Sequence, residues 1–407
     1  MIQAGTREFW RATLALSIGA FLVFANLYFT QPLLPIFTKE FTISPVTASL
    51  SLSVTTFSLG LSLLFFGPLS DALGRKKIML VTMVCVAAMT FLLASTPSFP
   101  AFLIYRFIEG FFIAGVPSIA IAYIGEEFSR RSLVTAIGVY ISGTSIGGMG
   151  GRLICGFATD FFGWRNAFLV MGVISILCLV LFLFLLPKSR NFQASSFKPG
   201  KIIRDFSKHI RNPVLLYAYF IGGIGLFLFV GEYNFVTFHL SGAPFYLPTA
   251  FVGMLFLTYL AGTLSSSLAG RWALRIPLSL CMGMGLAGMA LGMIITLIPN
   301  LWMILLGLLV NSFGFFMAHS TASAWVSRHA AFAKASASSL YLLFYYIGGS
   351  LGSFYLGFFY HWEGWPALVG GALLVLLGTG WLVRRLYRLE KKENQKSVHP
   401  EPMASNL

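Results

Sequence analysis

The sequence predicts an all-α membrane protein whose twelve transmembrane helices form two six-helix bundles. Three observations lead to this prediction: the composition, the number of long apolar segments, and the distribution of positive charge. Hydrophobic residues make up 57% of the 407 residues and charged residues only 10%, whereas soluble domains carry about 25% charged residues. So few ionic groups leave too little polar surface for water, so lipid is expected to cover much of the protein.

Twelve segments are long and apolar enough to cross a bilayer, which takes about 20 residues in a helix. Backbone groups in lipid must be hydrogen-bonded within the segment, so these segments are predicted to be helices. The short alternating segments of an outer-membrane barrel are not found. The twelve segments cover residues 12–36, 46–67, 78–96, 100–124, 132–156, 166–187, 213–239, 248–270, 277–298, 301–327, 335–359 and 363–384.

The net charge of +15 comes from basic residues clustered in the even-numbered loops and at the two chain ends. The only basic residues in the loops on the opposite side are Lys39 and Arg165. By the positive-inside rule, both termini are expected in the cytoplasm. Short clusters between apolar runs differ from the single basic face of a nucleic-acid-binding domain, so the lipid bilayer and not a nucleic acid is the predicted partner.

The longest polar loop divides the chain into equal halves. We predict an N-terminal six-helix bundle over residues 1–187 and a basic cytoplasmic linker over residues 188–212. A C-terminal six-helix bundle over residues 213–385 precedes a cytoplasmic tail over residues 386–407, which is expected to be disordered.

An internal repeat relates the two halves. A shift of 201 residues aligns the fifth segment with the eleventh, for example Tyr140 with Tyr341 and Gly147 with Gly348. Parallel repeats of this kind are typical of transporters whose binding site lies between the halves. An enzyme is not expected, because we find no cluster of metal ligands, no nucleophile with His and Asp partners and no phosphate-binding loop.

Three motifs then resemble those of the major facilitator superfamily. The loop Gly67-Pro-Leu-Ser-Asp71-Ala-Leu-Gly74-Arg75 is similar to its signature loop, and Arg106-Phe-Ile-Glu109-Gly to its fourth-helix motif. Gly163-Trp-Arg precedes the sixth segment as it does in that family. The segments 26–35 and 145–152 are similar to the YnfM-like group, in the drug:proton antiporter branch.

This resemblance implies a monomeric transporter of the cell inner membrane that works by alternating access. It implies export of a drug, sugar or metabolite, driven by the proton gradient rather than by a bound cofactor or metal. Gly148 occupies the position where antiporters of the superfamily often have Pro. Two alternatives remain open: an importer of a nutrient or organic anion by symport or uniport, which Arg106 and Arg152 could serve, and a non-transporting membrane sensor.

The signature loop is expected to act as a gate. The resemblance implies that Asp71 approaches the start of the eleventh helix, where a carboxylate is attracted to unpaired N–H groups. Arg75 is expected to pair with Glu126 or Glu127, and the loop, which includes Gly67 and Gly74, would stabilise an outward-facing state. Small residues recur every four positions in the fifth and eleventh segments, which predicts close helix packing: Gly143, Gly147, Gly151, Gly348 and Gly352.

Acidic residues inside the membrane must pair, face water or take a proton. Arg106 lies one turn from Glu109, so an ion pair or a proton site is predicted there. Glu232 has no Lys or Arg nearby in sequence and is therefore favoured as protonatable. Arg152 is expected to extend toward the interface or to meet Asp160.

The resemblance implies that the first, fourth, seventh and tenth helices line a central cavity. His319 is either a hydrogen-bonded core residue or a proton carrier. The predicted substrate and proton pathway comprises Asn26, Gln31, Arg106, Glu109, Tyr140, Arg152, Glu232, Asn311, His319, Tyr341 and Tyr345. The identity of the substrate is beyond what these residues predict.

Overall fold

The protein is described by a computed structural model that covers residues 1–192 and 199–398. Within these ranges, eleven helical stretches are long and apolar enough to cross a membrane. The last stretch, Lys334–Lys392, has 59 residues; as one helix it would be about 88 Å long, against a bilayer core of about 30 Å. Its backbone leaves the helical conformation at Glu363 and at Gly364, where φ is 67°. This stretch therefore crosses twice, which confirms the prediction of twelve helices.

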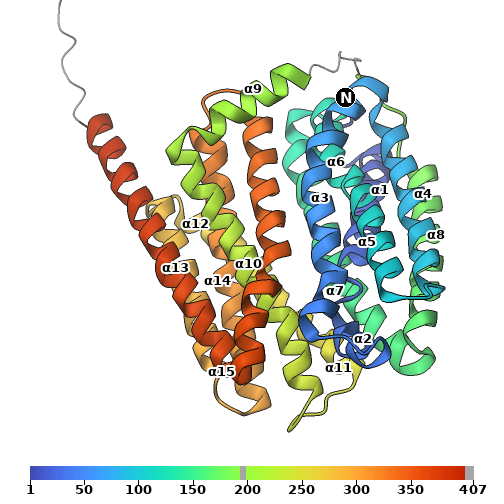
Figure 1. Ribbon diagram of the computed structural model, residues 1–407. Coiled ribbons are helices and arrows are strands. Elements are labelled where there is room, and N and C mark those ends of the chain that lie inside the picture. Colours follow the sequence, from blue (N-terminus) through green and yellow to red (C-terminus); the bar gives the residue numbers. More distant parts are fainter. Residues whose placement is uncertain (193–198, 399–407) are drawn as a thin grey trace, which may run out of the picture.

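The helices form two bundles that correspond to the two halves of the chain (Figure 1). The N-terminal bundle contains α1 (Arg7–Tyr28), α2 (Leu34–Glu40), α3 (Pro45–Leu73), α4 (Arg75–Ala94), α5 (Phe99–Ile113), α6 (Gly115–Glu127), α7 (Arg130–Phe162) and α8 (Trp164–Leu185), with a 3-10 turn, η1 (Gln31–Leu33), between α1 and α2. The C-terminal bundle contains α10 (Pro213–Ser241), α11 (Thr249–Met254), α12 (Tyr259–Trp272), α13 (Leu278–Ile295), α14 (Leu301–His329) and α15 (Lys334–Val398), with a turn η2 (Leu255–Thr258) between α11 and α12.

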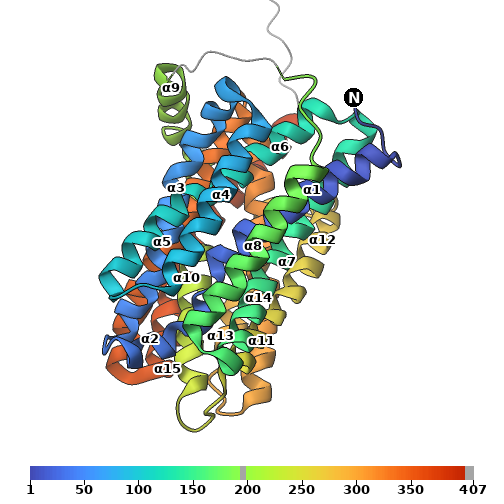
Figure 2. The same ribbon diagram turned by 90° about the vertical axis from the view of Figure 1, so that its right-hand side faces the viewer.

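The two ends of the molecule differ in what they carry. The N-terminus and the short helix α9 (Pro199–Ile210) lie at one end, called the terminal end below (Figures 1 and 2). Helices α2 and α11 lie at the opposite end, called the far end. An even number of crossings returns the chain to the end at which it started.

Three crossings are interrupted in the described part of the chain, and prolines lie at two of the interruptions. Pro32 lies in the turn between α1 and α2, and Pro117 follows the break between α5 and α6. Proline lacks the backbone N–H that a helix needs and disfavours the preceding turn. The third interruption, η2, separates α11 from α12. Discontinuous helices expose backbone groups within the membrane, a common feature near transport sites.

Glycines allow the same close helix contact in both bundles. A side chain at Gly147 would lie 2.7 Å from the Cα atom of Phe21 in α1, so α7 and α1 touch through their backbones. In the second half, Gly348 and Gly352 of α15 lie directly against Gly223 and Phe227 of α10. Gly143 and Gly151 make further contacts with α1 of the kind made by Gly147.

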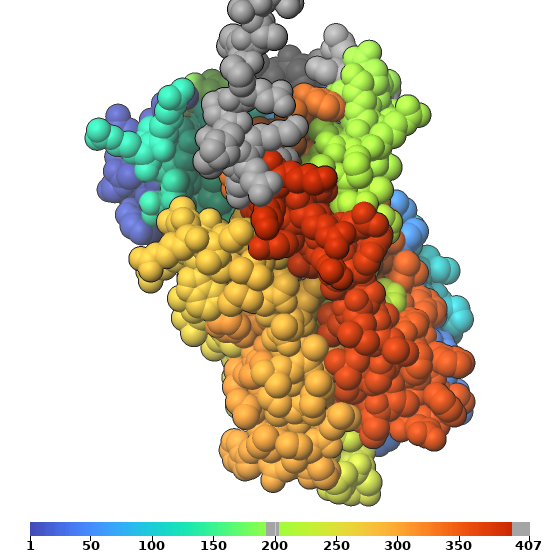
Figure 3. Space-filling model, turned by 90° about the vertical axis from the view of Figure 1, so that its left-hand side faces the viewer, coloured from blue at the N-terminus to red at the C-terminus, as the bar shows by residue number. Residues whose placement is uncertain are grey.

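The tail differs from the sequence prediction where the structure describes it, and part of the linker is helical. Residues 199–210 of the linker form α9, and α15 continues to Val398, so residues 386–398 are helical and not disordered. Glu390 accepts hydrogen bonds from the backbone N–H groups of Leu278 (3.0 Å) and Ser279 (3.1 Å), which holds the tail against the start of α13 (Figure 3). The remaining predicted linker and tail residues, 193–198 and 399–407, lie outside the described residues.

Candidate functional site

Arg106 and Glu109 form a buried ion pair inside the N-terminal bundle. Arg106 also donates to the carbonyl oxygens of Ser51 (2.9 Å), Asn26 (3.0 Å) and Leu27 (2.7 Å). All three guanidinium nitrogens are therefore engaged, and they connect α5 with α1 and α3. Buried charges are tolerated when they are paired and fully hydrogen-bonded in this way.

Asn26 belongs to the same internal network. Its side-chain amide donates to the Ser175 hydroxyl at 2.9 Å, and its side-chain oxygen lies 2.8 Å from the hydroxyl of Thr90, which is also 3.2 Å from Glu109. The structure thus places Asn26, Arg106 and Glu109 within one bundle.

Glu232 is a fully buried acid of the C-terminal bundle that has no cationic partner among the described residues. One carboxyl oxygen contacts the amide group of Asn311 in α14. The other carboxyl oxygen and the Asn311 side-chain oxygen have no hydrogen-bond partner. Two buried acceptors therefore lie beside one another without enough donors, an arrangement that costs free energy unless a proton is supplied.

Arg152 is a buried cation without an acidic partner among the described residues. Its guanidinium lies 4.1 Å from the ring centroids of both Tyr28 in α1 and Phe256 in η2, and 4.9 Å from that of Tyr259 in α12. It also donates to Gln31 (2.7 Å) and to the Gly148 carbonyl (2.9 Å). Aromatic faces attract a cation, most strongly where water is excluded, so this cage joins the two bundles.

A chain of hydrogen bonds continues from Arg152 across the boundary between the bundles. Gln31 donates to the side-chain oxygen of Asn234 in α10 at 2.6 Å, and Asn234 donates to Ser353 in α15 at 2.8 Å. All four side chains are buried. Asn234 is only two residues from Glu232, so the cross-bundle chain and the unpaired acid share one helical turn.

The bundles also touch directly at the far end. Asp160 at the end of α7 accepts hydrogen bonds from the backbone N–H groups of Thr249 (3.2 Å) and Ala250 (2.8 Å) at the start of α11. Of the two alternatives for Arg152, the meeting with Asp160 is wrong, because Asp160 caps α11 instead. Arg152 does not extend to solvent either, since it is only 1% exposed. A side chain at Gly156 would lie 2.6 Å from the Thr249 carbonyl oxygen, which shows how closely α7 and α11 approach. The far end is sealed in this conformation.

The signature loop at the terminal end forms contacts within its own bundle. Arg75 pairs with Asp71 and donates to Glu126 at 2.6 Å and 3.2 Å. Glu127 does not pair with Arg75. It accepts hydrogen bonds from the backbone N–H groups of Arg190 and Asn191 at the start of the linker. Among the described residues, no hydrogen bond or ion pair joins Asp71 to α15. Gly67 lies within α3, and Gly74, with φ of 100°, is the single residue between α3 and α4; a side chain at either would meet no atom within 4 Å.

His319 contacts the two predicted tyrosines of α15. It lies 2.8 Å from the Tyr341 hydroxyl, and its ring centroid is 4.4 Å from that of Tyr345. Tyr140 is buried in α7. The predicted pathway residues thus separate into a network inside the N-terminal bundle, a far-end boundary and an aromatic group in the C-terminal bundle.

Several residues at the boundary were missed by the sequence analysis: Tyr28, Asn234, Phe256, Tyr259, Tyr346 and Ser353. A signal existed for one of them, because Asn234 is a second polar residue beside Glu232 in an otherwise apolar run. The aromatic residues gave no such signal, since aromatic side chains are frequent throughout this sequence.

Comparison with known proteins agrees with this geometry. The sequence pattern of the Major Facilitator Superfamily matches residues 16–267 and 249–404. The chain belongs to the Major Facilitator Superfamily. It is 39% identical over 403 residues to the uncharacterized MFS-type transporter YybF of Bacillus subtilis, covering 98% of this chain and 99% of that protein. It is also 39% identical to the inner membrane transport protein YnfM of Escherichia coli, covering 95% and 93%.

Solved structures of superfamily members have the same fold. A bacterial homolog of the human lysosomal transporter Spinster, in an inward-facing and unoccupied conformation, aligns with a TM-score of 0.72 over 94% of this chain and 96% of that one, at 16% identity. The nucleoside transporter NupG aligns with a TM-score of 0.71 over 91% and 99%, at 15% identity. The predicted resemblance and fold are confirmed: this is a multi-pass secondary transporter of the superfamily and not an enzyme.

Proposed function

We propose that this transporter exports a small molecule in exchange for protons, as a monomer in the cell inner membrane with its terminal end in the cytoplasm. The orientation is supported by the basic residues at the loops and termini of that end. The location is supported by the similarity to YnfM, an inner membrane transport protein. With this orientation, a seal at the far end corresponds to an inward-facing state.

The observation that carries the proposal is the pair of unpartnered acceptors at Glu232 and Asn311. A proton on Glu232 would supply the missing donor and remove the negative charge. Burial of an unpaired carboxylate in a membrane protein costs several kcal/mol, so the sealed arrangement favours the protonated acid. We therefore propose Glu232 as the proton site.

The position of Glu232 links its charge to the seal. The next residue is Tyr233, whose hydroxyl lies 2.6 Å from the Thr258 hydroxyl and 2.8 Å from the Ser312 hydroxyl. The residue after that, Asn234, accepts a hydrogen bond from Gln31 of the other bundle. Loss of the proton would place a bare negative charge behind the sealed boundary. Opening of the far end would let water hydrate that charge at the boundary, so deprotonation favours the outward-facing state.

This relation gives an exchange cycle. The protonated, inward-facing transporter takes cargo from the cytoplasm and loses its proton there. The deprotonated form opens outward, releases the cargo and takes up a proton, which seals the far end again. The inward proton gradient thereby drives export, in line with the resemblance to the drug:proton antiporter branch.

The alternative of organic-anion import has less support. Arg106 is occupied by Glu109 and three backbone carbonyls, and Arg152 lies inside the sealed boundary with its faces covered by rings. Neither guanidinium is presented to a cargo that enters from the terminal end in this conformation.

Purified protein in liposomes with a trapped pH indicator tests the proposal. A panel of uncharged aromatic compounds, sugars and amphipathic drugs is applied as outward or inward gradients without an imposed pH difference. The proposal predicts that at least one compound drives protons in the opposite direction, and that Glu232→Gln abolishes this proton movement. Proton movement in the same direction as the cargo, or full proton coupling in Glu232→Gln, would contradict it. A sensor would move neither.

A further inference from the structure

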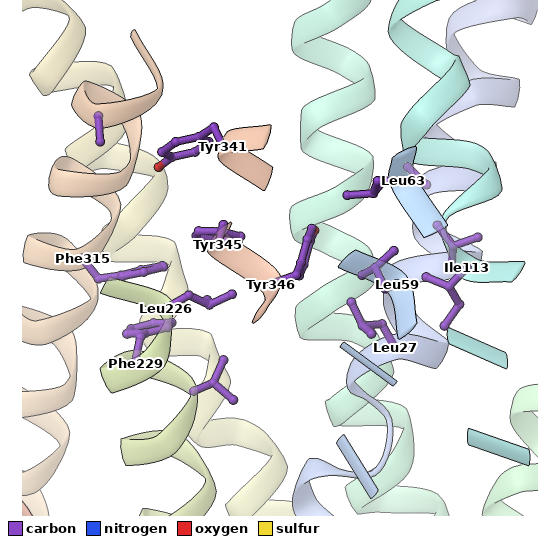
Figure 4. Packing of buried hydrophobic residues seen from close by; sticks show 14 of the residues in the cluster. Leu27, Leu59, Leu63, Ile113, Leu226, Phe229, Phe315, Tyr341, Tyr345 and Tyr346 are labelled. Atoms are coloured by element: carbon purple, nitrogen blue, oxygen red, sulfur yellow. The ribbon is translucent and has the colours of Figure 1, made fainter. Parts of the chain in front are cut away.

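Aromatic side chains form a continuous wall in the C-terminal bundle. Phe315 and His319 lie one turn apart in α14, and Tyr341 and Tyr345 lie one turn apart in α15. Tyr345 is 4.4 Å from His319, 6.2 Å from Tyr341 and 6.3 Å from Phe315 between ring centroids, with the rings inclined by 37° or less. Figure 4 shows Tyr341, Tyr345 and Phe315 one above another on the same side of the bundle boundary.

The opposite wall belongs to the N-terminal bundle. Figure 4 shows Leu59 and Leu63 of α3 facing the aromatic wall, with Tyr346 between the two sides. A side chain at Gly60 would lie 3.1 Å from the Cβ atom of Tyr346, so α3 and α15 approach each other closely there.

Polar groups of this boundary are available for a ligand. The hydroxyls of Tyr345 and Tyr346 and the second ring nitrogen of His319 form no hydrogen bond to any residue in 1–192 or 199–398. These atoms are not sealed from solvent, in contrast to the hydroxyl of Tyr219, which is buried without a partner. His319 also remains partly exposed, although its ring contacts that of Tyr345.

The charge of this region is as informative as its shape. The five residues of the central aromatic site (Phe315, His319, Tyr341, Tyr345 and Tyr346) include no acid, Lys or Arg. The buried charges of Arg152 and Glu232 belong to the far-end boundary and its adjoining turn. A charged cargo in this site would lose its hydration without gaining a counter-ion, which is costly. Binding pockets that are mostly apolar, with a few convergent polar groups, suit uncharged ligands with a flat face.

We propose that the central aromatic site binds an uncharged amphipathic molecule with a flat ring, stacked against Tyr345 and hydrogen-bonded by the free tyrosine and histidine groups. This names the cargo class of the proposed exporter, and so rests on its alternating access. The far end is sealed, so such a cargo reaches the site from the terminal end. Ring stacking selects the flat body, and the hydroxyls select polar substituents at its edge.

Binding of 2-naphthol, 2-naphthoate and glucose to the purified protein at neutral pH tests the proposal. These probes are a flat uncharged ring with a hydroxyl, a flat anion and an uncharged molecule without an aromatic face. Equilibrium dialysis in detergent needs no proton gradient, so the result does not depend on coupling through Glu232. We expect 2-naphthol to bind at least about tenfold more tightly than either other probe. Equal or tighter binding of 2-naphthoate or glucose, or no binding of 2-naphthol, overturns the proposal.

Substitutions locate the site. Tyr345→Leu should weaken 2-naphthol binding about threefold to tenfold, because it removes an aromatic partner, whereas Tyr345→Phe keeps the ring and should lose less. Tyr387→Leu is the matched control, since Tyr387 is 42% exposed in the last part of α15. Undiminished binding in Tyr345→Leu overturns the assignment. If Tyr345→Leu does not fold, Tyr345→Phe is compared with Tyr387→Leu. A greater loss of 2-naphthol affinity in Tyr345→Phe supports the site, and equal affinity in the two variants overturns it.

The binding assay and the transport assay separate the two proposals. Selective binding of 2-naphthol without proton exchange in liposomes would refute the proposed function and leave the cargo site in place.

Discussion

Substitution of Gln31 by Leu tests the hydrogen-bond chain that joins the two bundles. Gln31 is fully buried, accepts a hydrogen bond from Arg152 at 2.7 Å and donates one to Asn234 at 2.6 Å. Leucine is close to glutamine in size, so packing is largely kept while both hydrogen bonds are lost. The substitution therefore weakens the far-end seal more than it weakens either bundle.

The structure sets the size of the expected effect. A hydrogen bond to a charged group contributes about 1.5–3 kcal/mol and a neutral one about 0.5–1.5 kcal/mol. Loss of both costs the sealed state about 2–4.5 kcal/mol relative to the outward-facing state, in which water can hydrate Arg152 and Asn234. Because each 1.4 kcal/mol is a factor of ten, the ratio of outward-facing to sealed protein should rise about 30-fold or more.

Spin labels across the far end measure this ratio. Phe161 in α7 and Tyr246 after α10 are 77% and 71% exposed on opposite bundles, so cysteines there accept labels without disturbing the seal. Gln31→Leu should move the distance distribution toward longer values. Ser175→Ala is the control, because it removes a buried hydrogen-bond partner within one bundle and should leave the distribution unchanged. An unaltered distribution in folded Gln31→Leu would refute the reasoning.

Three further substitutions test other parts of the account. Glu109→Gln leaves the Arg106 guanidinium buried without its carboxylate and should cost about 3–5 kcal/mol of stability; an unchanged melting temperature in detergent would show that the pair is dispensable. Gly147→Val forces α7 away from α1 and should lower the melting temperature, whereas Gly138→Val, which meets no neighbour within 4 Å, should lower it less; equal effects would remove the packing role. Asp71→Asn should reduce the outward-facing population seen by labels across the terminal end, and an unchanged population would remove the gating role proposed for the loop.

The fold could be predicted from sequence because its main determinants are local. The length of each apolar segment identifies a membrane crossing. The concentration of basic residues in alternate loops indicates that those loops lie on one side of the membrane. The Arg106–Glu109 pair was also predictable, since residues three apart in a helix face the same way. The break at Glu363 and Gly364 lies at the start of the last predicted crossing, 363–384, within five residues of the end of the preceding one at residue 359.

The boundary between the bundles could not be predicted in the same way. Arg152 contacts Phe256, and Gln31 contacts Asn234, across separations of more than one hundred residues. Such pairs depend on how two helical bundles are inclined to each other, which no spacing within a segment encodes. The same limit explains the wrong partner for Asp160, which sequence placed near Arg152 but which caps another helix.

The helical tail was missed for a different reason. Its polar and charged composition favours disorder in isolation. In the folded protein Glu390 is nevertheless buried against the N–H groups at the start of α13. This contact with α13 is tertiary, so the composition of the tail does not encode it.

The most direct test of alternating access controlled by a proton on Glu232 is the pH dependence of the far-end distance. Labels at Phe161→Cys and Tyr246→Cys are measured in lipid from acidic to alkaline pH, with and without Glu232→Gln. The account predicts short distances at acidic pH, longer distances as the carboxyl loses its proton, and short distances at every pH in Glu232→Gln. The same pH-dependent opening in Glu232→Gln as in the unsubstituted chain would contradict it.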